Sequence, residues 1–168
     1  VFELPNSDQI KNWVASGVAT VEMHALSFLD GRGSPNAFSS RAANAAMCVS
    51  EYSPDNFFEY NTRIFKSQPT EGAPGPENAE LISFAEEVGA TNMEQISSCI
   101  NEKAFGNWIK DSTERALTQP IPGTDIQVSG TPTVLVNGQQ YTWETGEELA
   151  SAARFAQFVQ LVTSGGLD

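Results

Sequence analysis

Residues 130–138 constrain the fold of this chain more than any other segment does. Within them, Pro132 precedes a short apolar and β-branched run, which Asn137 and Gly138 follow. Proline has no N–H to donate to a sheet ladder, so it belongs at the first residue of a strand or on a sheet edge. Asn-Gly is the strongest short hairpin signal because both residues accept positive φ. The segment therefore predicts a β-hairpin whose returning strand covers residues 139–142.

The rest of the chain is predicted to be mainly helical. Apolar side chains recur at helical spacing through most of it, and Gly and Pro separate the periodic segments. Residues 18–26 differ, because they alternate between an apolar face and a mixed face, which predicts a strand. The expected elements are a helix from residues 6–8 to Gly17, the strand at 18–26, four or five helices over 39–117, the hairpin, and a terminal helix over 147–162.

This order of elements predicts one domain with an insertion. A chain of 168 residues suits a single domain. The predicted helices at 39–117 interrupt a small α/β unit between its first strand and its hairpin. We therefore expect residues 1–30 and 118–168 to form one domain, and residues 31–117 to form an all-helical insertion.

The composition excludes several classes of partner. The formal net charge is −12, with only 9 Lys+Arg residues. Binding to phosphates needs clustered Lys and Arg, and an anionic membrane surface would also repel this chain, so we expect no nucleic-acid partner. Two isolated cysteines and one histidine do not make a metal site, so we expect no metal. No apolar run is long enough to span a membrane, and no signal peptide is present at Val1.

Four short segments, taken in order, resemble one family. They are Phe2-Glu3, residues 24–29 (HALSFL), residues 40–46 (SRAANAA) and residues 129–133 (SGTPT). Together with the element order, they make the chain similar to the DsbA-like thiol-disulfide oxidoreductases, which are thioredoxin folds with a helical domain inserted in the middle. In that family the peptide bond before the proline of the last segment is cis. X-Pro is the only peptide bond for which the cis form costs little free energy relative to trans. The alternative is an ordinary hairpin with a trans proline.

The resemblance implies an α/β, thioredoxin-like fold whose catalytic Cys-x-x-Cys and N-terminal strand would lie just before Val1. The sequence contains no Cys-x-x-Cys. A globular protein without its central strand would expose unpaired sheet edges. We therefore expect the chain to be part of a longer protein; the alternative is a redox-inactive relative.

The resemblance also assigns site residues. Gly130, Thr131 and Pro132 would form the loop that binds an extended substrate chain beside the reactive sulfur. Glu3 would match a buried carboxylate that relays a proton to or from the redox pair, and the alternative for it is a surface acid in the first turn of a helix. Relatives often place a lysine on the adjoining strand, where this chain has none, and His24 could substitute for it.

The residues alone allow Cys48 and Cys99 to form one disulfide or to remain two buried thiols. Both fall in the predicted helical insertion, where some DsbA-like proteins carry a structural disulfide. The resemblance therefore implies a Cys48–Cys99 bond, and such a bond would indicate an oxidising compartment.

By the same resemblance, the protein is expected to be an extracytoplasmic enzyme that forms disulfides in exported proteins. It would be secreted or anchored to the outer face of a bacterial membrane, and would act as a monomer without a bound cofactor. Its partners would be reduced or unfolded exported proteins and a membrane quinone-linked reoxidase. One alternative is a redox-inactive thioredoxin-like module that binds or chaperones peptides. Another is a glutathione-transferase-type relative, although Ser7 lies too late for the serine that such a relative needs.

Overall fold

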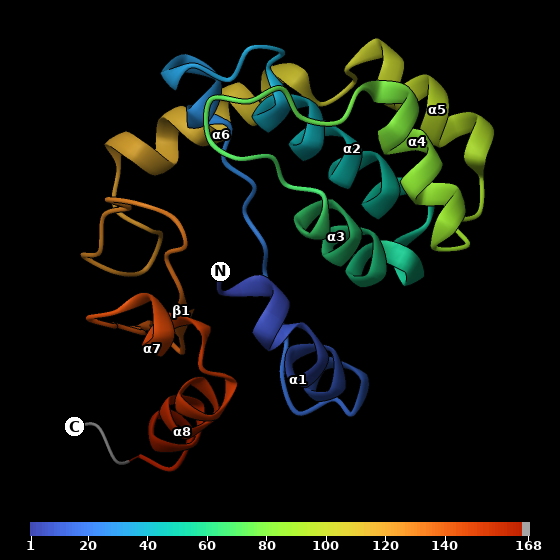
Figure 1. Cartoon of the computed structure of the whole chain (residues 1–168). Coiled ribbons are helices and arrows are strands. Elements are labelled where there is room, and N and C mark those ends of the chain that lie inside the picture. Colours follow the sequence, from blue (N-terminus) through green and yellow to red (C-terminus); the bar gives the residue numbers. More distant parts are fainter. Residues whose placement is uncertain (166–168) are drawn as a thin grey trace. The chain divides into compact units, whose positions relative to one another are not determined.

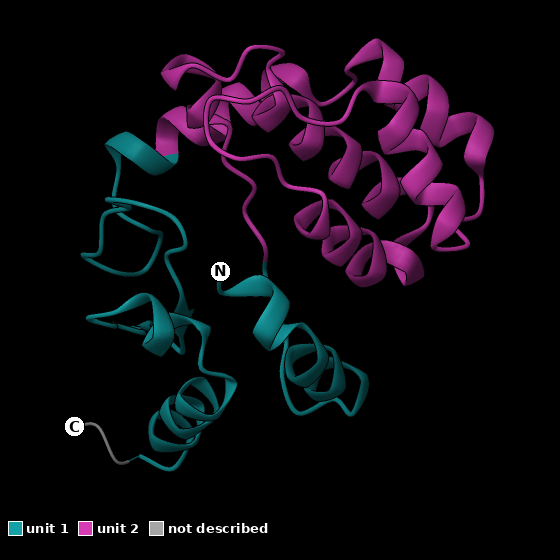
Figure 2. Cartoon of the chain, viewed as in Figure 1, with its two compact units in different colours: residues 1–22, 116–168 teal, residues 23–115 magenta. Residues whose placement is uncertain are grey.

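The computed structural model describes residues 1–165, which form two compact units (Figures 1 and 2). Within the described residues, unit 1 comprises residues 1–22 and 116–165, and unit 2 comprises Met23–Arg115. No helix in the described residues has both the length and the apolar character that a membrane crossing requires.

Unit 2 is all-helical. Its elements are η1 (Phe28–Arg32), α2 (Phe38–Tyr52), η2 (Pro54–Asn56), α3 (Phe57–Lys66), α4 (Asn78–Glu87), α5 (Met93–Glu102) and most of α6 (Gly106–Thr118). Helix α2 packs against α3, α4 and α5. The buried face of α2 includes Ala45 and Ala46, and short side chains let neighbouring helices approach closely. The core also contains Val49, Tyr60, Leu81, Phe84, Ile96 and Ile100.

The loop before α4 is held to α2 by close contacts. The buried Arg41 donates from Nε to the Asn36 carbonyl at 2.8 Å and from Nη1 to the Pro76 carbonyl at 2.7 Å. Gly75 lies against the Phe38 ring, so closely that a Cβ on Gly75 would stand 2.2 Å from Phe38 Cγ. Only glycine fits at this position because any side chain would overlap the ring.

Unit 1 contains α1 (Glu3–Ala15), β1 (Leu135–Val136), β2 (Gln139–Gln140), α7 (Gly146–Ala150) and α8 (Ala152–Thr163). The strands pair antiparallel, with Leu135 opposite Gln140 and Val136 opposite Gln139. Asn137 and Gly138 both have positive φ, at 47° and 83°. This is the geometry that a two-residue Asn-Gly hairpin requires, and it confirms the predicted turn. The ladder is shorter than the predicted strand at 139–142.

The core of unit 1 is aromatic. Phe2, Tyr141 and Phe155 are buried together, and the rings of Phe2 and Phe155 meet edge to face with centroids 4.9 Å apart. This is a preferred arrangement of aromatic rings. Because Phe2 directly precedes α1, the cluster links the start of α1 to α8 and to the segment after the hairpin.

The predicted strand at residues 18–26 is wrong. These residues have no regular secondary structure, and Val18, Val21 and Met23 are exposed. A strand exists only when a partner satisfies its backbone groups, and no ladder pairs with this segment in the described part of the chain. The predicted terminal helix at 147–162 is instead two helices, because Ser151 has extended ψ and its hydroxyl caps α8 by accepting the Arg154 N–H.

The unit boundaries also differ from the predicted domains. Residues 23–30 belong to the helical unit and not to the other domain. Two contacts explain this. The Ser27 N–H donates to Thr113 Oγ1 at 3.0 Å, and the Asp30 carboxylate accepts the N–H groups of Ser39 and Ser40 at 2.9 and 3.0 Å. Asp30 therefore satisfies the amides of the second and third residues of α2, while the Phe38 N–H at its first residue donates to Ser34 Oγ.

Candidate functional site

The loop at residues 129–133 leads directly toward β1. Its Thr131–Pro132 peptide bond is cis. Thr133 Oγ1 donates to the Gly130 carbonyl at 2.7 Å, which closes the loop across the proline. Gly130 and Thr131 are exposed and Pro132 is half-buried. The structure thus brings Gly130, Thr131 and Pro132 together on one accessible loop of unit 1.

The aromatic core supports this loop from behind. The Tyr141 N–H donates to the Val134 carbonyl at 2.9 Å, and Val134 and Val136 pack against the aromatic cluster. Tyr141 is only 2 % exposed, and its hydroxyl donates to the Glu148 carbonyl at 3.1 Å. The hairpin is therefore fixed on its buried side by the aromatic core. The loop that precedes it is attached to this packed structure while its backbone remains accessible.

Glu3 is half-exposed and not buried as the resemblance implied. It is the first residue of α1, and its side chain is 30 % exposed. Its carboxylate lies 3.9 Å from the Val1 nitrogen. A carboxylate in the first turn is favoured by the positive end of the helix dipole, which accounts for its place without burial. The residue buried at this point is its neighbour Phe2.

His24 is an exposed residue in the irregular segment at the start of unit 2. Glu3, Gly130, Thr131 and Pro132 all belong to unit 1. A partnership between His24 and Glu3 therefore remains an expectation from the resemblance.

Cys48 of α2 and Cys99 of α5 are joined by a disulfide in unit 2. Their Cα atoms are 5.9 Å apart, and both residues belong to the core cluster. The buried Asn44 lies beside the bond: its Nδ2 is 3.7 Å from Cys48 Sγ, and its Oδ1 accepts the Phe105 N–H at 2.9 Å. The two cysteines thus connect the helices that make the most contact in this unit.

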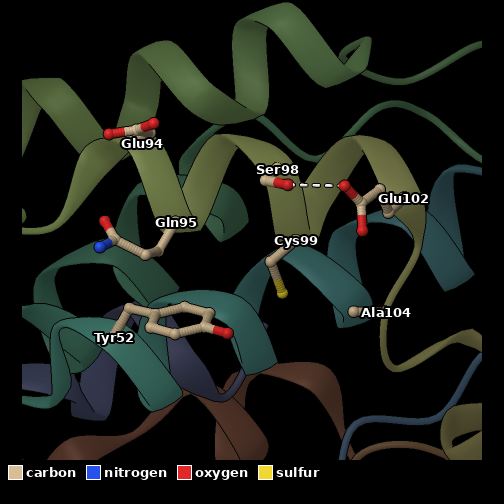
Figure 3. A pocket seen from close by; sticks show the side chains of 7 residues that line it. All are labelled: Tyr52, Glu94, Gln95, Ser98, Cys99, Glu102 and Ala104. Atoms are coloured by element: carbon tan, nitrogen blue, oxygen red, sulfur yellow. Dashed lines mark hydrogen bonds between the residues drawn. The ribbon is translucent and has the colours of Figure 1, made fainter.

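The sequence analysis missed a cavity next to this disulfide (Figure 3). It has a volume of about 370 Å³ and is lined by Tyr52, Glu94, Gln95, Ser98, Cys99, Glu102 and Ala104. The signal that could have found it is helical spacing, because Gln95 and Glu102 are four residues before and three residues after Cys99 and so share its face of α5. In residues 1–165, no group of His, Cys, Asp and Glu side chains is arranged to hold a metal.

Comparisons with known proteins agree with this architecture. A protein-family model described as Thioredoxin matches residues 2–154. The reduced form of the disulfide bond oxidoreductase DsbG from Mycobacterium tuberculosis is 28% identical, with a TM-score of 0.76 over 96% of this chain and 70% of that one. The oxidised form of Mtb DsbA is 25% identical, with a TM-score of 0.71 over 95% of this chain and 80% of that one. No curated protein matches the chain.

These findings confirm the resemblance that was drawn from the element order and from the four short segments. They also confirm a thioredoxin-like fold with mostly helical content and few strands, of the DsbA and DsbG type. The chain belongs to the thioredoxin family.

Proposed function

We propose that this chain is the fold and substrate-binding part of an extracytoplasmic thiol-disulfide oxidoreductase that forms disulfides in exported proteins. The observation that carries the proposal is the likeness to DsbG and DsbA over 96% and 95% of the chain. The exposed loop at Gly130, Thr131 and Pro132 supports it, because this loop offers a backbone to a substrate.

The reactive cysteine pair is proposed to lie upstream of Val1. A cysteine at a helix N-terminus is held as a thiolate by the helix dipole, which makes the disulfide form of such a pair a strong oxidant. A substrate thiolate attacks this disulfide and forms a mixed disulfide. The second substrate thiol then displaces the enzyme cysteine, so the substrate leaves with a new disulfide and the enzyme pair is reduced.

Each loop residue has a proposed part in this exchange. The Thr131 backbone pairs with an extended substrate segment in β fashion. Pro132, which has no N–H, shapes the groove without offering a donor to the thiolate. The Thr131 hydroxyl tunes the redox equilibrium by hydrogen bonding to the reactive sulfur. Accordingly, Thr131→Val should shift the equilibrium between the full-length protein and glutathione, whereas an unchanged constant would exclude this role of the hydroxyl.

Glu3 is the proposed proton relay, and its carboxylate lies in the first turn of α1 with the side chain 30 % exposed. His24 is the weaker candidate. The proposed partners are reduced exported proteins and a membrane quinone-linked reoxidase, with no bound cofactor. The Cys48–Cys99 disulfide fits the proposed extracytoplasmic location, because such bonds persist in oxidising compartments.

The proposal is tested on the protein purified from its native source. Intact mass is measured before and after alkylation under denaturing conditions, with and without reduction. Two further cysteines that are alkylated only after reduction, in a product heavier than 18.1 kDa, would support it. Oxidation of a reduced substrate protein should then persist in the Cys48→Ala/Cys99→Ala variant of that product, because these two residues are not the reactive pair. Loss of oxidation in a folded variant would contradict this assignment.

The second candidate is a redox-inactive thioredoxin-like module that binds or chaperones extended peptides. One observation favours it: Cys48 and Cys99, the two cysteines of the sequence, are joined to each other. A native product near 18.1 kDa that binds unfolded polypeptides without oxidising them would select this function.

A further inference from the structure

The two sulfurs of the Cys48–Cys99 disulfide have different surroundings. Cys48 is 0 % exposed and does not line the cavity beside α5. Cys99 is 5 % exposed and forms part of the cavity wall. Figure 3 shows its side chain pointing from α5 into the space between Tyr52 and Ala104. Cys99 is therefore the cysteine of the pair that borders the cavity, and Cys48 lies behind it.

The environment of Cys48 suits a leaving thiolate. Thiol–disulfide exchange breaks the bond by placing an electron pair on the sulfur that is not attacked. Asn44 Nδ2 lies 3.7 Å from Cys48 Sγ and can donate to it. Asn44 is held in place because its Oδ1 accepts the Phe105 N–H. Attack at Cys99 thus releases a sulfur beside an amide donor that also faces the carbonyls of Cys99 and Ile100, each at 3.4 Å.

Carboxylates flank the point of entry. Glu94 and Glu102 both line the cavity, and Ser98 Oγ donates to Glu102 Oε1 at 2.6 Å, which holds this carboxylate on the cavity side of α5 (Figure 3). Along the helix, Glu102 is displaced from Cys99 by about 4.5 Å and Glu94 by about 7.5 Å, since each residue rises ~1.5 Å. Both carboxylates line the same cavity as Cys99, and charges are screened over ~10 Å at 0.1 M salt. The negative potential at the cavity therefore acts on any charged thiol that approaches.

We propose that Cys99 is the entry point for small external thiols, and that Glu94 and Glu102 make the entry selective for cationic aminothiols over anionic thiols. In the first step the thiolate bonds to Cys99 Sγ, the Cys48–Cys99 bond breaks, and Cys48 leaves as a thiolate. In the second step another thiolate attacks the small-molecule sulfur of the mixed disulfide and releases Cys99. The protein gains two thiols, and two molecules of aminothiol become one disulfide.

The first experiment maps the site of attack on the native full chain. Cysteamine is added in the absence of denaturant, and samples are acidified, denatured and alkylated with N-ethylmaleimide before peptide mapping. The cysteamine adduct is expected on Cys99 and the maleimide on Cys48. Adducts that are equally frequent on both cysteines, or that favour Cys48, would overturn the proposal. So would a reduction rate independent of cysteamine concentration, because opening of the fold would then precede attack.

The second experiment measures charge selectivity. Rate constants, corrected to thiolate concentration, are compared for cysteamine, whose thiolate is a zwitterion, and glutathione, whose thiolate is doubly negative. The ratio of the two constants should fall about three- to tenfold in Glu94→Gln/Glu102→Gln, and the fall should shrink at 1 M salt. Taking the ratio within each protein cancels the intrinsic reactivities of the two thiols.

The matched control is Glu71→Gln/Glu86→Gln, which removes two exposed carboxylates of the same unit that do not line the cavity. Its selectivity ratio should equal that of the unmodified chain. An unchanged ratio in Glu94→Gln/Glu102→Gln, or an equal fall in the control, would show that the cavity carboxylates do not select the thiol.

Discussion

Reduction of the Cys48–Cys99 disulfide should destabilise unit 2 by about 4 kcal/mol. The bond closes a loop across 51 positions. On the chain-entropy model, opening a loop of this length raises the conformational entropy of the unfolded chain by about 14 cal/mol/K. At 25 °C this entropy lowers the free energy of the unfolded chain by ~4 kcal/mol. Reduction removes no side chain from the core. The change in the free energy of unfolding is therefore attributed to the unfolded chain. The whole loop lies within Met23–Arg115, so the effect belongs to unit 2.

The assay is urea unfolding followed by helical ellipticity, since most of the helices belong to unit 2. Oxidised protein is compared with protein that was reduced in denaturant and refolded in the presence of reductant. With a urea dependence of about 1–3 kcal/mol/M, the midpoint should fall by ~1.5–4 M. The Cys48→Ala/Cys99→Ala variant is the control, and its midpoint should not respond to reductant. A loss below ~1 kcal/mol on reduction would refute the loop-entropy argument.

Three further substitutions test how local contacts hold the fold. Arg41→Met should cost about 2–4 kcal/mol, measured by urea unfolding, because two backbone carbonyls near α2 lose their donor; a cost below ~1 kcal/mol would show that water replaces the guanidinium. Gly138→Ala should cost about 1–2 kcal/mol in thermal unfolding, because its φ is 83°, and an unchanged melting temperature would contradict this. Gly75→Ala should destabilise the protein, and adding Phe38→Ala should relieve part of that cost if the overlap with the ring is the cause; additive effects would refute it.

The local elements of this protein follow from local signals. Asn137 and Gly138 determine the hairpin turn because few residues adopt positive φ in succession. The helices of unit 2 follow from their apolar spacing, and Gly89 ends α4 with positive φ. Of the predicted site, Gly130, Thr131 and Pro132 lie together on one loop, with the first two exposed and Pro132 half-buried, because they are contiguous in the sequence.

Contacts between distant residues could not be predicted in this way. The alternation of apolar and polar side chains in residues 18–26 is compatible with a strand. A strand also needs a neighbouring strand to pair its backbone groups, and no local pattern shows whether one is present. The Asp30 carboxylate accepts the amides of Ser39 and Ser40 at the start of α2, because the chain between them folds back and places residue 30 beside the helix end. The half-exposed setting of Glu3 likewise depends on how its neighbour Phe2 packs.

The sequence by itself therefore determined the Asn-Gly turn and most of the helical segments, since these depend on backbone preferences and periodicity. Only the tertiary structure decided which cysteine of the disulfide lines a cavity and which carboxylates line it as well. That cavity is formed by Tyr52, Ala104 and one face of α5, and their meeting depends on the packing of α2 against α5. Burial and electrostatic potential are properties of packed surfaces, so they arise only once distant segments are brought together.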